Sequence, residues 1–144
     1  MGKVMLLWQF WAFLAAIFAA LTAVFAKIGV EHINSDFATF IRTIVVLLAL
    51  GLILYGTDQF QPLSTISGKT YLFLLLSGLA TGASWICYFR ALKLGHAHQV
   101  APVDKLSVVF VALFAATFLG EHISGLGWIG ISLISAGAIV LAIG

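Results

Sequence analysis

Five long apolar runs, separated by short polar links, dominate the chain: residues 4–26, 37–56, 70–92, 100–119 and 124–143. Each run approaches the ~20 residues with which a helix crosses ~30 Å of hydrocarbon. The runs are too long and too uniformly apolar for membrane-barrel strands, which alternate in polarity over ~10 residues. A helix also satisfies its own backbone hydrogen bonds inside lipid. The pattern therefore predicts an all-α polytopic membrane protein with five transmembrane helices.

Composition supports this class and excludes others. The chain is 62% hydrophobic and only 8% charged, whereas soluble domains carry about 25% charged residues. Five helices and their links use all of residues 1–144, so we expect a single membrane domain. The first apolar run exceeds the 7–15 residues of a signal-peptide core, and we expect it to span the membrane. The net charge of +2 is too small and dispersed to suggest nucleic-acid binding.

Small residues mark candidate packing faces. Gly78 and Gly82 form a GxxxG motif in the third run, and Gly130 and Gly137 repeat at seven residues in the fifth. Such spacings let helices approach closely in lipid. Glycine is also common in membrane helices in general, so the motifs can equally be incidental. We assign these four glycines to helix packing.

Charged residues inside the apolar runs are the first candidates for function, because burying a charge at mid-membrane costs roughly 2.5–3.5 kcal/mol. Asp104 and Lys105 are adjacent in the fourth run, while Arg42 and Arg90 lie in the second and third. We expect Asp104 to pair with Arg42 or Arg90, which would leave a cation to attract an anionic or zwitterionic solute. The alternative is a structural layer of charges whose side chains reach the membrane surface.

A polar and aromatic face runs along the third helix. Its members, spaced by three and four residues, are Ser77, Thr81, Trp85 and Tyr88. Residues at this spacing share one side of a helix. Rings and hydroxyls together can line a cavity and hold a solute. Alternatively, the hydroxyls bond back to their own helix and the rings fill the core.

Other candidate chemistry is weak. His96 and His98 have a metal-like spacing but no carboxylate or cysteine beside them, and Cys87 is the only cysteine. No catalytic or phosphate-binding motif is present. We therefore expect no metal, no cofactor and no enzymatic activity. Pro102 fits the first turn of the fourth helix, where its missing N–H costs little, or else a local helix break that exposes backbone groups.

Five spans place the two termini on opposite sides of the membrane. The flanking cations are balanced, with Lys3 and Lys69 on one side and Lys27 and Lys93 on the other. Balanced cations give little preference for either orientation. Many transporters are built from two inverted repeats, yet this chain contains no internal repeat. A second copy, inserted the opposite way up, could supply the missing half.

Several segments together resemble one family. They are residues 26–29, 37–43, 77–95, 100–107, 118–121 and 128–137. This set, which extends over nearly the whole chain, resembles the EamA-type unit of the drug/metabolite transporter superfamily. Most members carry two units and ten helices, whereas this chain carries one. The resemblance implies an antiparallel homodimer that forms the ten-helix inverted repeat.

The function predicted from these features is secondary transport of a small polar or amphipathic metabolite across the cell inner membrane by alternating access. The predicted solute-binding residues are Arg42, Ser77, Thr81, Trp85, Tyr88, Asp104 and Lys105. The competing interpretation is a membrane scaffold or accessory subunit whose charges are purely structural.

Overall fold

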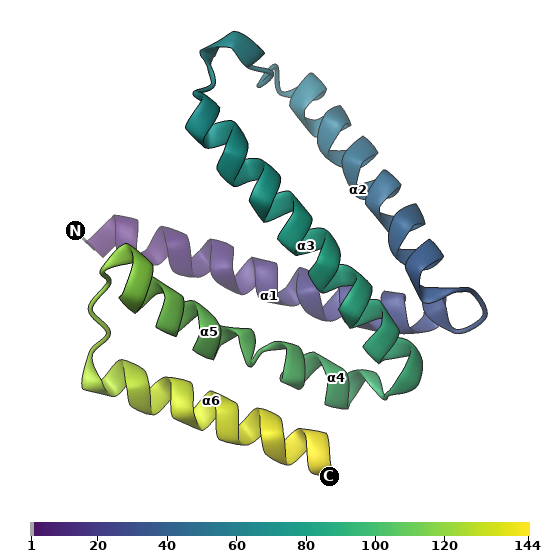
Figure 1. Ribbon diagram of the computed structural model, residues 1–144, viewed down its shortest axis with the longest axis vertical. Helices are drawn as coiled ribbons and strands as arrows, with labels where there is room; N and C mark the ends of the chain where they lie inside the picture. The colour runs from purple at the N-terminus through teal and green to yellow at the C-terminus, as the bar shows by residue number, and fades with distance from the viewer. Residues whose placement is uncertain (1) are drawn as a thin grey trace. The chain divides into compact units, whose positions relative to one another are not determined.

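The computed structural model describes the backbone of residues 2–144 and the side chains of residues 7–144, and all regular secondary structure in that part of the chain is helical. Lys3, one of the flanking cations, has a side chain outside the described set. The elements in chain order are α1 (Gly2–Val30), α2 (Ser35–Gly56), the short 3₁₀ helix η1 (Leu63–Thr65), α3 (Gly68–Leu94), α4 (Ala97–Asp104), α5 (Ser107–Phe114), the π-helix η2 (Ala115–Leu119) and α6 (Gly125–Ile143) (Figure 1).

Within the described residues, five segments are long and apolar enough to cross a membrane, which confirms the five predicted helices. They are Leu7–Val30, Ser35–Gly56, Gly68–Leu94, Ala97–Leu119 and Gly125–Ile143. The third span begins and ends two residues outside the apolar run 70–92, since polar residues of the links continue the helix. The fourth span differs most from the prediction, because three short helices replace one continuous helix.

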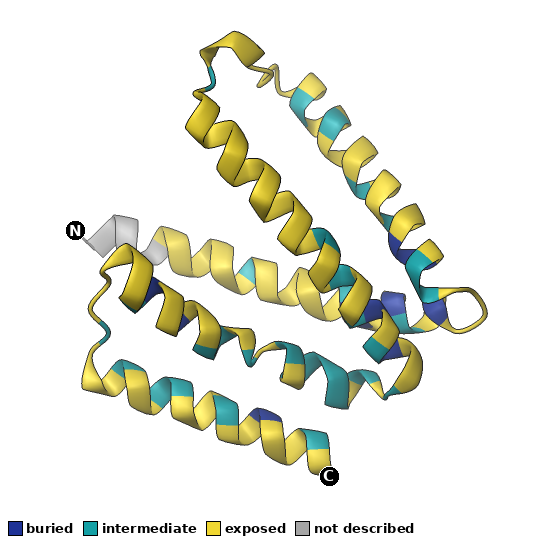
Figure 2. Cartoon of the chain, in the orientation of Figure 1, coloured by how far each residue is buried: buried dark blue, intermediate teal, exposed yellow. Residues whose placement is uncertain are grey.

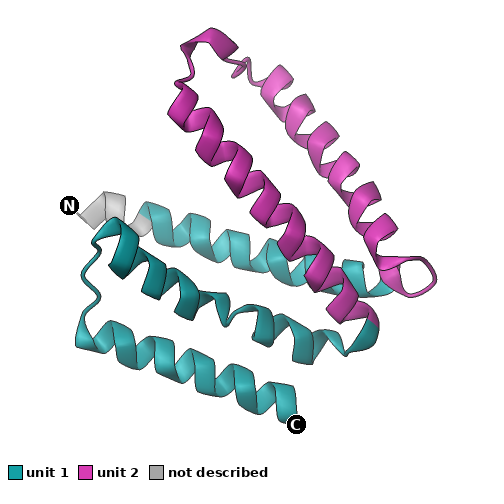
Figure 3. Cartoon of the chain, in the orientation of Figure 1, with its two compact units in different colours: residues 1–28, 94–144 teal, residues 29–93 magenta. Residues whose placement is uncertain are grey.

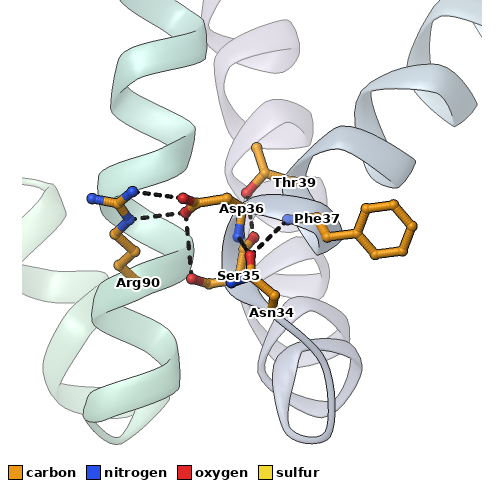
Figure 4. Close-up of polar contacts among 6 residues, drawn as sticks. All are labelled: Asn34, Ser35, Asp36, Phe37, Thr39 and Arg90. Atoms are coloured by element: carbon orange, nitrogen blue, oxygen red, sulfur yellow. Dashed lines mark hydrogen bonds and ion pairs between the residues drawn. The ribbon is translucent and has the colours of Figure 1, made fainter.

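Two helix starts follow from local sequence. The Oδ1 of Asn34 accepts hydrogen bonds from the backbone N–H groups of Asp36 (2.9 Å) and Phe37 (3.1 Å) at the start of α2 (Figure 4). The Oγ of Ser124 accepts one from the N–H of Gly127 (3.2 Å) at the start of α6. Both side chains satisfy N–H groups that have no partner within the helix. Asn34 and Ser124 therefore mark where these two helices begin.

The chain forms two compact units (Figure 3). The first contains residues 1–28 and 94–144, and in it α4 packs against α6. The second contains residues 29–93, in which α3 returns antiparallel to α2 after a link that includes η1. The hydroxyl of Tyr71 donates to the carbonyl of Leu63 (3.0 Å) and so ties η1 to the start of α3.

Little of each span is buried within the chain, as the predominance of exposed surface in Figure 2 shows. The buried share is between 6% and 17% for the five spans. Alanine occupies many buried positions, including Ala23, Ala26, Ala112, Ala115 and Ala138. Small side chains allow close packing where lipid supplies no hydrophobic driving force. The remaining apolar surface is of the kind that lipid or another membrane protein covers.

The glycines assigned to helix packing make no close approach within the described chain. A Cβ added at Gly78, Gly82, Gly130 or Gly137 would meet no atom within 4 Å. Gly82 and Gly130 are only half-buried, and the other two are exposed. Contact of these faces with a second copy stays a prediction.

Candidate functional site

The start of α2 and the end of α3 bring two predicted site residues together. The guanidinium carbon of Arg42 lies over the ring of Trp85, 4.1 Å from its centroid, and 5.5 Å from the centroid of Phe89. Both distances are within the ~6 Å range of cation–π attraction. Arg42 follows Ser35, the first residue of α2, by seven positions, which places it about 10 Å along the helix axis. The cation therefore lies well inside the second span.

One nitrogen of this guanidinium has no hydrogen-bond acceptor. The Nη1 of Arg42 is buried, and no acceptor among the described residues bonds to it. Arginine carries five N–H donors and stays charged. Leaving a buried donor unsatisfied costs about 1–3 kcal/mol, and more when it is charged. The rings of Trp85 and Phe89 attract the charge, but no oxygen of the described residues accepts this hydrogen bond.

A bidentate ion pair joins the same two helices nearer the start of α2 and the end of α3. Arg90 donates from Nε to Oδ1 of Asp36 (2.8 Å) and from Nη2 to Oδ2 (2.6 Å) (Figure 4). Asp36 lies in the first turn of α2, where the helix dipole favours an anion. Lys93 adds a hydrogen bond from Nζ to the carbonyl of Ile33. These contacts fasten the beginning of α2 to the end of α3.

The pairing of Arg90 corrects the sequence analysis, which gave this arginine Asp104 as a possible partner. Its carboxylate partner in the structure is Asp36. Asp36 lies in the first turn of α2, 54 positions before Arg90, and no spacing in the sequence relates the two residues. Because α3 returns antiparallel to α2, the start of α2 lies beside the end of α3, and this brings Asp36 to Arg90.

The fourth span has a local break after Pro102, as one of the two interpretations of this residue expected. The exposure of backbone groups at that break stays a prediction. Pro102 lies inside α4 and has no N–H to continue the helical hydrogen bonds. The N–H groups of Lys105 and Leu106 then bond three residues back, to Pro102 and Val103, both at 3.0 Å. These tight bonds end α4 at Asp104, and α5 begins at Ser107. Pro102 therefore does not lie in the first turn, as the other interpretation required.

Asp104 and Lys105 lie at this break and pair with each other. The Nζ of Lys105 is 3.2 Å from Oδ2 of Asp104, with the two side chains 61% and 35% exposed, respectively. The flexible lysine stem folds back to reach its neighbour. Arg42 and Asp104 belong to different compact units, and the pairing expected between them stays a prediction.

Comparison with known proteins now adds to the geometry. Residues 6–143 match the sequence model of the EamA-like transporter family. The chain belongs to this family. It is also 62% identical over 136 residues to a protein of Sinorhizobium sp named "Uncharacterized transporter in cobO 3'region", covering 94% of this chain and 96% of the relative. No solved structure matches it.

Membership of the EamA-like family, together with five spans, makes the chain a multi-pass membrane protein with a role in transport. The resemblance seen in the sequence is therefore confirmed. The family match places no individual residue in a binding site, so the roles of the predicted site residues depend on the geometry alone.

The remaining residues of the predicted polar face lie on both sides of Trp85 along α3, with Ser77 and Thr81 nearer its start and Tyr88 nearer its end. Ser77 and Thr81 are exposed, and the hydroxyl of Thr81 donates to the carbonyl of Ser77 (2.9 Å). This bond is the one that the alternative interpretation expected. Tyr88 is half-buried near Trp85 in the sequence. The structure thus joins Trp85 to Arg42, while Ser77 and Thr81 continue the same face beyond that contact.

Two features of the structure were missed by the sequence analysis. Phe89 is buried, and its ring faces the guanidinium of Arg42. Phe89 follows Trp85 by four positions, and this helical spacing could have placed both rings on one face. The π-helix η2 ends the fourth span at Gly120, whose φ of 67° is in the left-handed region. Glycine adopts that conformation without steric cost. Short π-helical segments occur frequently at functional sites, and nothing in the sequence pattern indicated this one.

Proposed function

We propose that the protein is a secondary transporter of a small polar or amphipathic metabolite, working by alternating access in the cell inner membrane. The break in the fourth span at Asp104 and Lys105 is the observation that carries this proposal. Irregular backbone at membrane depth is tolerated only where protein covers it or water reaches it. Transporters use such discontinuous helices to present backbone groups and charges to a solute.

The transporting unit in this proposal is an antiparallel homodimer. The described residues of one chain form five spans, each largely exposed within the chain, and five helices are few to enclose a path for a solute. A second copy in the opposite orientation would complete an inverted repeat. The balance of Lys3 and Lys69 against Lys27 and Lys93 in the sequence supports insertion in both orientations. A topology reporter fused to the C-terminus should then give signal on both sides of the membrane, and signal on one side alone would reject dual topology.

The solute path in this proposal runs along two sets of residues. Arg42 and the polar face of α3 form one, and the charged pair at the helix break forms the other. The members are Arg42, Ser77, Thr81, Trp85, Tyr88, Asp104 and Lys105. None of these roles needs a bound cofactor or a catalytic step.

Flux into proteoliposomes tests the function directly. The purified protein should move at least one compound from a panel of labelled amino acids, organic acids, amines and sugars. The double variant Asp104→Asn with Lys105→Gln removes the pair without leaving a lone charge, and it should fold normally but lose most flux. Lys69→Gln is the matched control, since Lys69 is an exposed cation at the start of α3.

A second candidate function is a membrane scaffold without transport. The Asp36–Arg90 pair favours it, because this pair joins two helices and serves packing. Absence of flux for every compound, with a correctly folded dimer, would favour the scaffold. Full flux in the Asp104→Asn, Lys105→Gln variant would instead keep transport and remove the assigned role of the break.

A further inference from the structure

Arg42, which lies in the second span, has a buried N–H donor without a hydrogen-bond acceptor among the described residues. Its Nη1 is buried without an acceptor among the described residues, while the guanidinium lies against two aromatic rings. Aromatic faces attract the positive charge but do not replace an oxygen that accepts the N–H hydrogen bond. The missing partner is therefore a hydrogen-bond acceptor, and the positive charge favours an anionic one.

The groups nearest along the chain have other bonds. The hydroxyls of Thr39 and Thr43, one on each side of Arg42, donate to the carbonyls of Ser35 (2.9 Å) and Thr39 (2.8 Å). The carboxylate of Asp36 binds Arg90 through both oxygens. The second compact unit thus neutralises Arg90 with a carboxylate, whereas the groups that the structure places beside Arg42 are the rings of Trp85 and Phe89 and, through an electrostatic interaction, Tyr88.

The contrast between these two arginines indicates different roles. Arg90 is exposed near the end of α3 and has a bidentate carboxylate partner. Arg42 lies deeper along the span, where a charge is costly, yet no carboxylate among the described residues pairs with it. An arginine that serves packing alone gains from a permanent carboxylate, whereas one that binds a solute must leave its hydrogen-bond donors available.

We propose that Arg42 anchors the solute of this transporter through an oxyanion, either a carboxylate or a phosphate, which accepts hydrogen bonds from its guanidinium. This inference rests on the proposed transport function and specifies its substrate class as small organic anions or zwitterions. The planar fork of arginine matches both oxyanions in a bidentate manner. The rings of Trp85 and Phe89 then contact the apolar part of the solute, and rotation of the long arginine side chain brings Nη1 to the oxyanion.

Equilibrium binding to the purified full-length protein in neutral detergent tests this proposal without measuring flux. The probes are benzoate and phenyl phosphate, compared with the neutral benzamide and the cationic benzylamine. Because a hydrogen bond to a charged group contributes about 1.5–3 kcal/mol, one or both oxyanions should bind about tenfold or more tightly than benzamide. Preference for benzoate identifies carboxylate as the solute group, and preference for phenyl phosphate identifies phosphate.

Two variants locate the binding at Arg42. Arg42→Gln should remove the preference for oxyanions, and Arg42→Lys should weaken oxyanion binding about tenfold or more, since lysine keeps the charge but loses the fork. Lys69→Gln should bind as the parent does. If Arg42→Gln does not fold, Arg42→Lys and the selectivity of the unaltered protein still decide the outcome.

Three results would overturn the proposal. The first is that the unaltered protein binds benzoate, phenyl phosphate and benzamide equally. The second is that Arg42→Lys and Arg42→Gln bind both oxyanions as tightly as the parent. The third is that phosphatidylglycerol displaces both oxyanions and the protein transports no organic anion. The last would assign the site to a lipid phosphate. If the protein then transports a neutral or cationic solute, the proposed transport function stands, but Arg42 is not the residue that anchors the solute.

Discussion

The contact between Arg42 and Trp85 allows a quantitative test of what holds α2 against α3. A double-mutant cycle with Arg42→Met and Trp85→Leu removes the charge and the ring while keeping apolar side chains of some length. The centroid distance of 4.1 Å is well within cation–π range. Such a contact contributes about 0.5–1 kcal/mol when exposed and about 2 kcal/mol when desolvated. Since Arg42 is half-buried, we expect a coupling free energy of about 1–2 kcal/mol.

The single variants alone would be misleading. Arg42→Met loses the attraction to the rings but also removes the buried, unsatisfied Nη1, which relieves about 1–3 kcal/mol. The two effects oppose each other, so the free energy of unfolding of Arg42→Met should stay close to that of the parent. The cycle isolates the pairwise part, because the relief appears in both arms that carry Arg42→Met.

The assay is reversible unfolding in mixed micelles, followed by circular dichroism at increasing fractions of a denaturing detergent. A parallel cycle between Arg42 and Phe89 is the internal control, because this ring lies farther away, at 5.5 Å. Its coupling should be the smaller of the two. A coupling between Arg42 and Trp85 within about 0.3 kcal/mol of zero, the usual limit of additivity, would refute the contact as a stabilising interaction.

Three further predictions concern the other parts of the site. The first is a double-mutant cycle of Asp36→Asn and Arg90→Gln, in which each single variant leaves the other group without its bidentate partner. The double variant should therefore have a higher melting temperature than the sum of the two single effects predicts. Additive shifts in melting temperature would contradict this. Pro102→Ala restores a backbone N–H inside α4, so it should stabilise the protein by up to about 3 kcal/mol and slow flux in proteoliposomes; faster flux would argue against a role for the break. In a Cys87→Ser background, a water-soluble thiol reagent should label single cysteines on the polar face of α3 more than a cysteine at Leu79, with uniform labelling as the contrary result. The substituted face positions are Ser77, Thr81, Trp85 and Tyr88.

The spans and their caps could be predicted from the sequence because their causes are local. Lipid requires a fixed length of apolar residues with all backbone groups bonded internally, and this requirement appears directly in the apolar runs. Asn34 and Ser124 precede the helices that they cap, so a side chain that can accept from the first N–H groups is visible in the sequence. Neither feature depends on how the helices pack.

The partners of the charged residues could not be predicted in the same way. Arg90 binds Asp36, 54 positions earlier in the chain, and the contact exists only because α3 returns antiparallel to α2. The relative rotation of two helices decides which of several carboxylates meets an arginine. Asp104 bonds its own neighbour Lys105 because the helix is interrupted between α4 and α5, and the sequence left that interruption as one of two interpretations of Pro102.

Trp85 shows an intermediate case. Its spacing correctly grouped it with Tyr88 and Thr81 on one face, but spacing could not show which part of that face meets α2. The structure divides the face: Trp85 lies under Arg42, while Ser77 and Thr81 stay exposed nearer the start of α3. A pattern in one helix defines a face, and only the partner helix defines where along it a contact occurs.

The position of these contacts also bears on how α2 could move. Among the described residues, the polar and cation–π contacts between α2 and α3 lie where α2 begins and α3 ends, from Asp36 to Arg42 on α2. The 22 residues of α2 span about 33 Å, so about 20 Å of the helix extends beyond Arg42. A tilt about the Asp36–Arg90 ion pair would displace the far end of α2 about three times as much as Arg42 itself, in proportion to their distances from it. In the proposed alternating-access mechanism, a solute that draws Arg42 away from Trp85 acts close to the end of α2 that the ion pair holds. A small shift of Arg42 there produces a larger movement of the far end of α2, at the other side of the membrane.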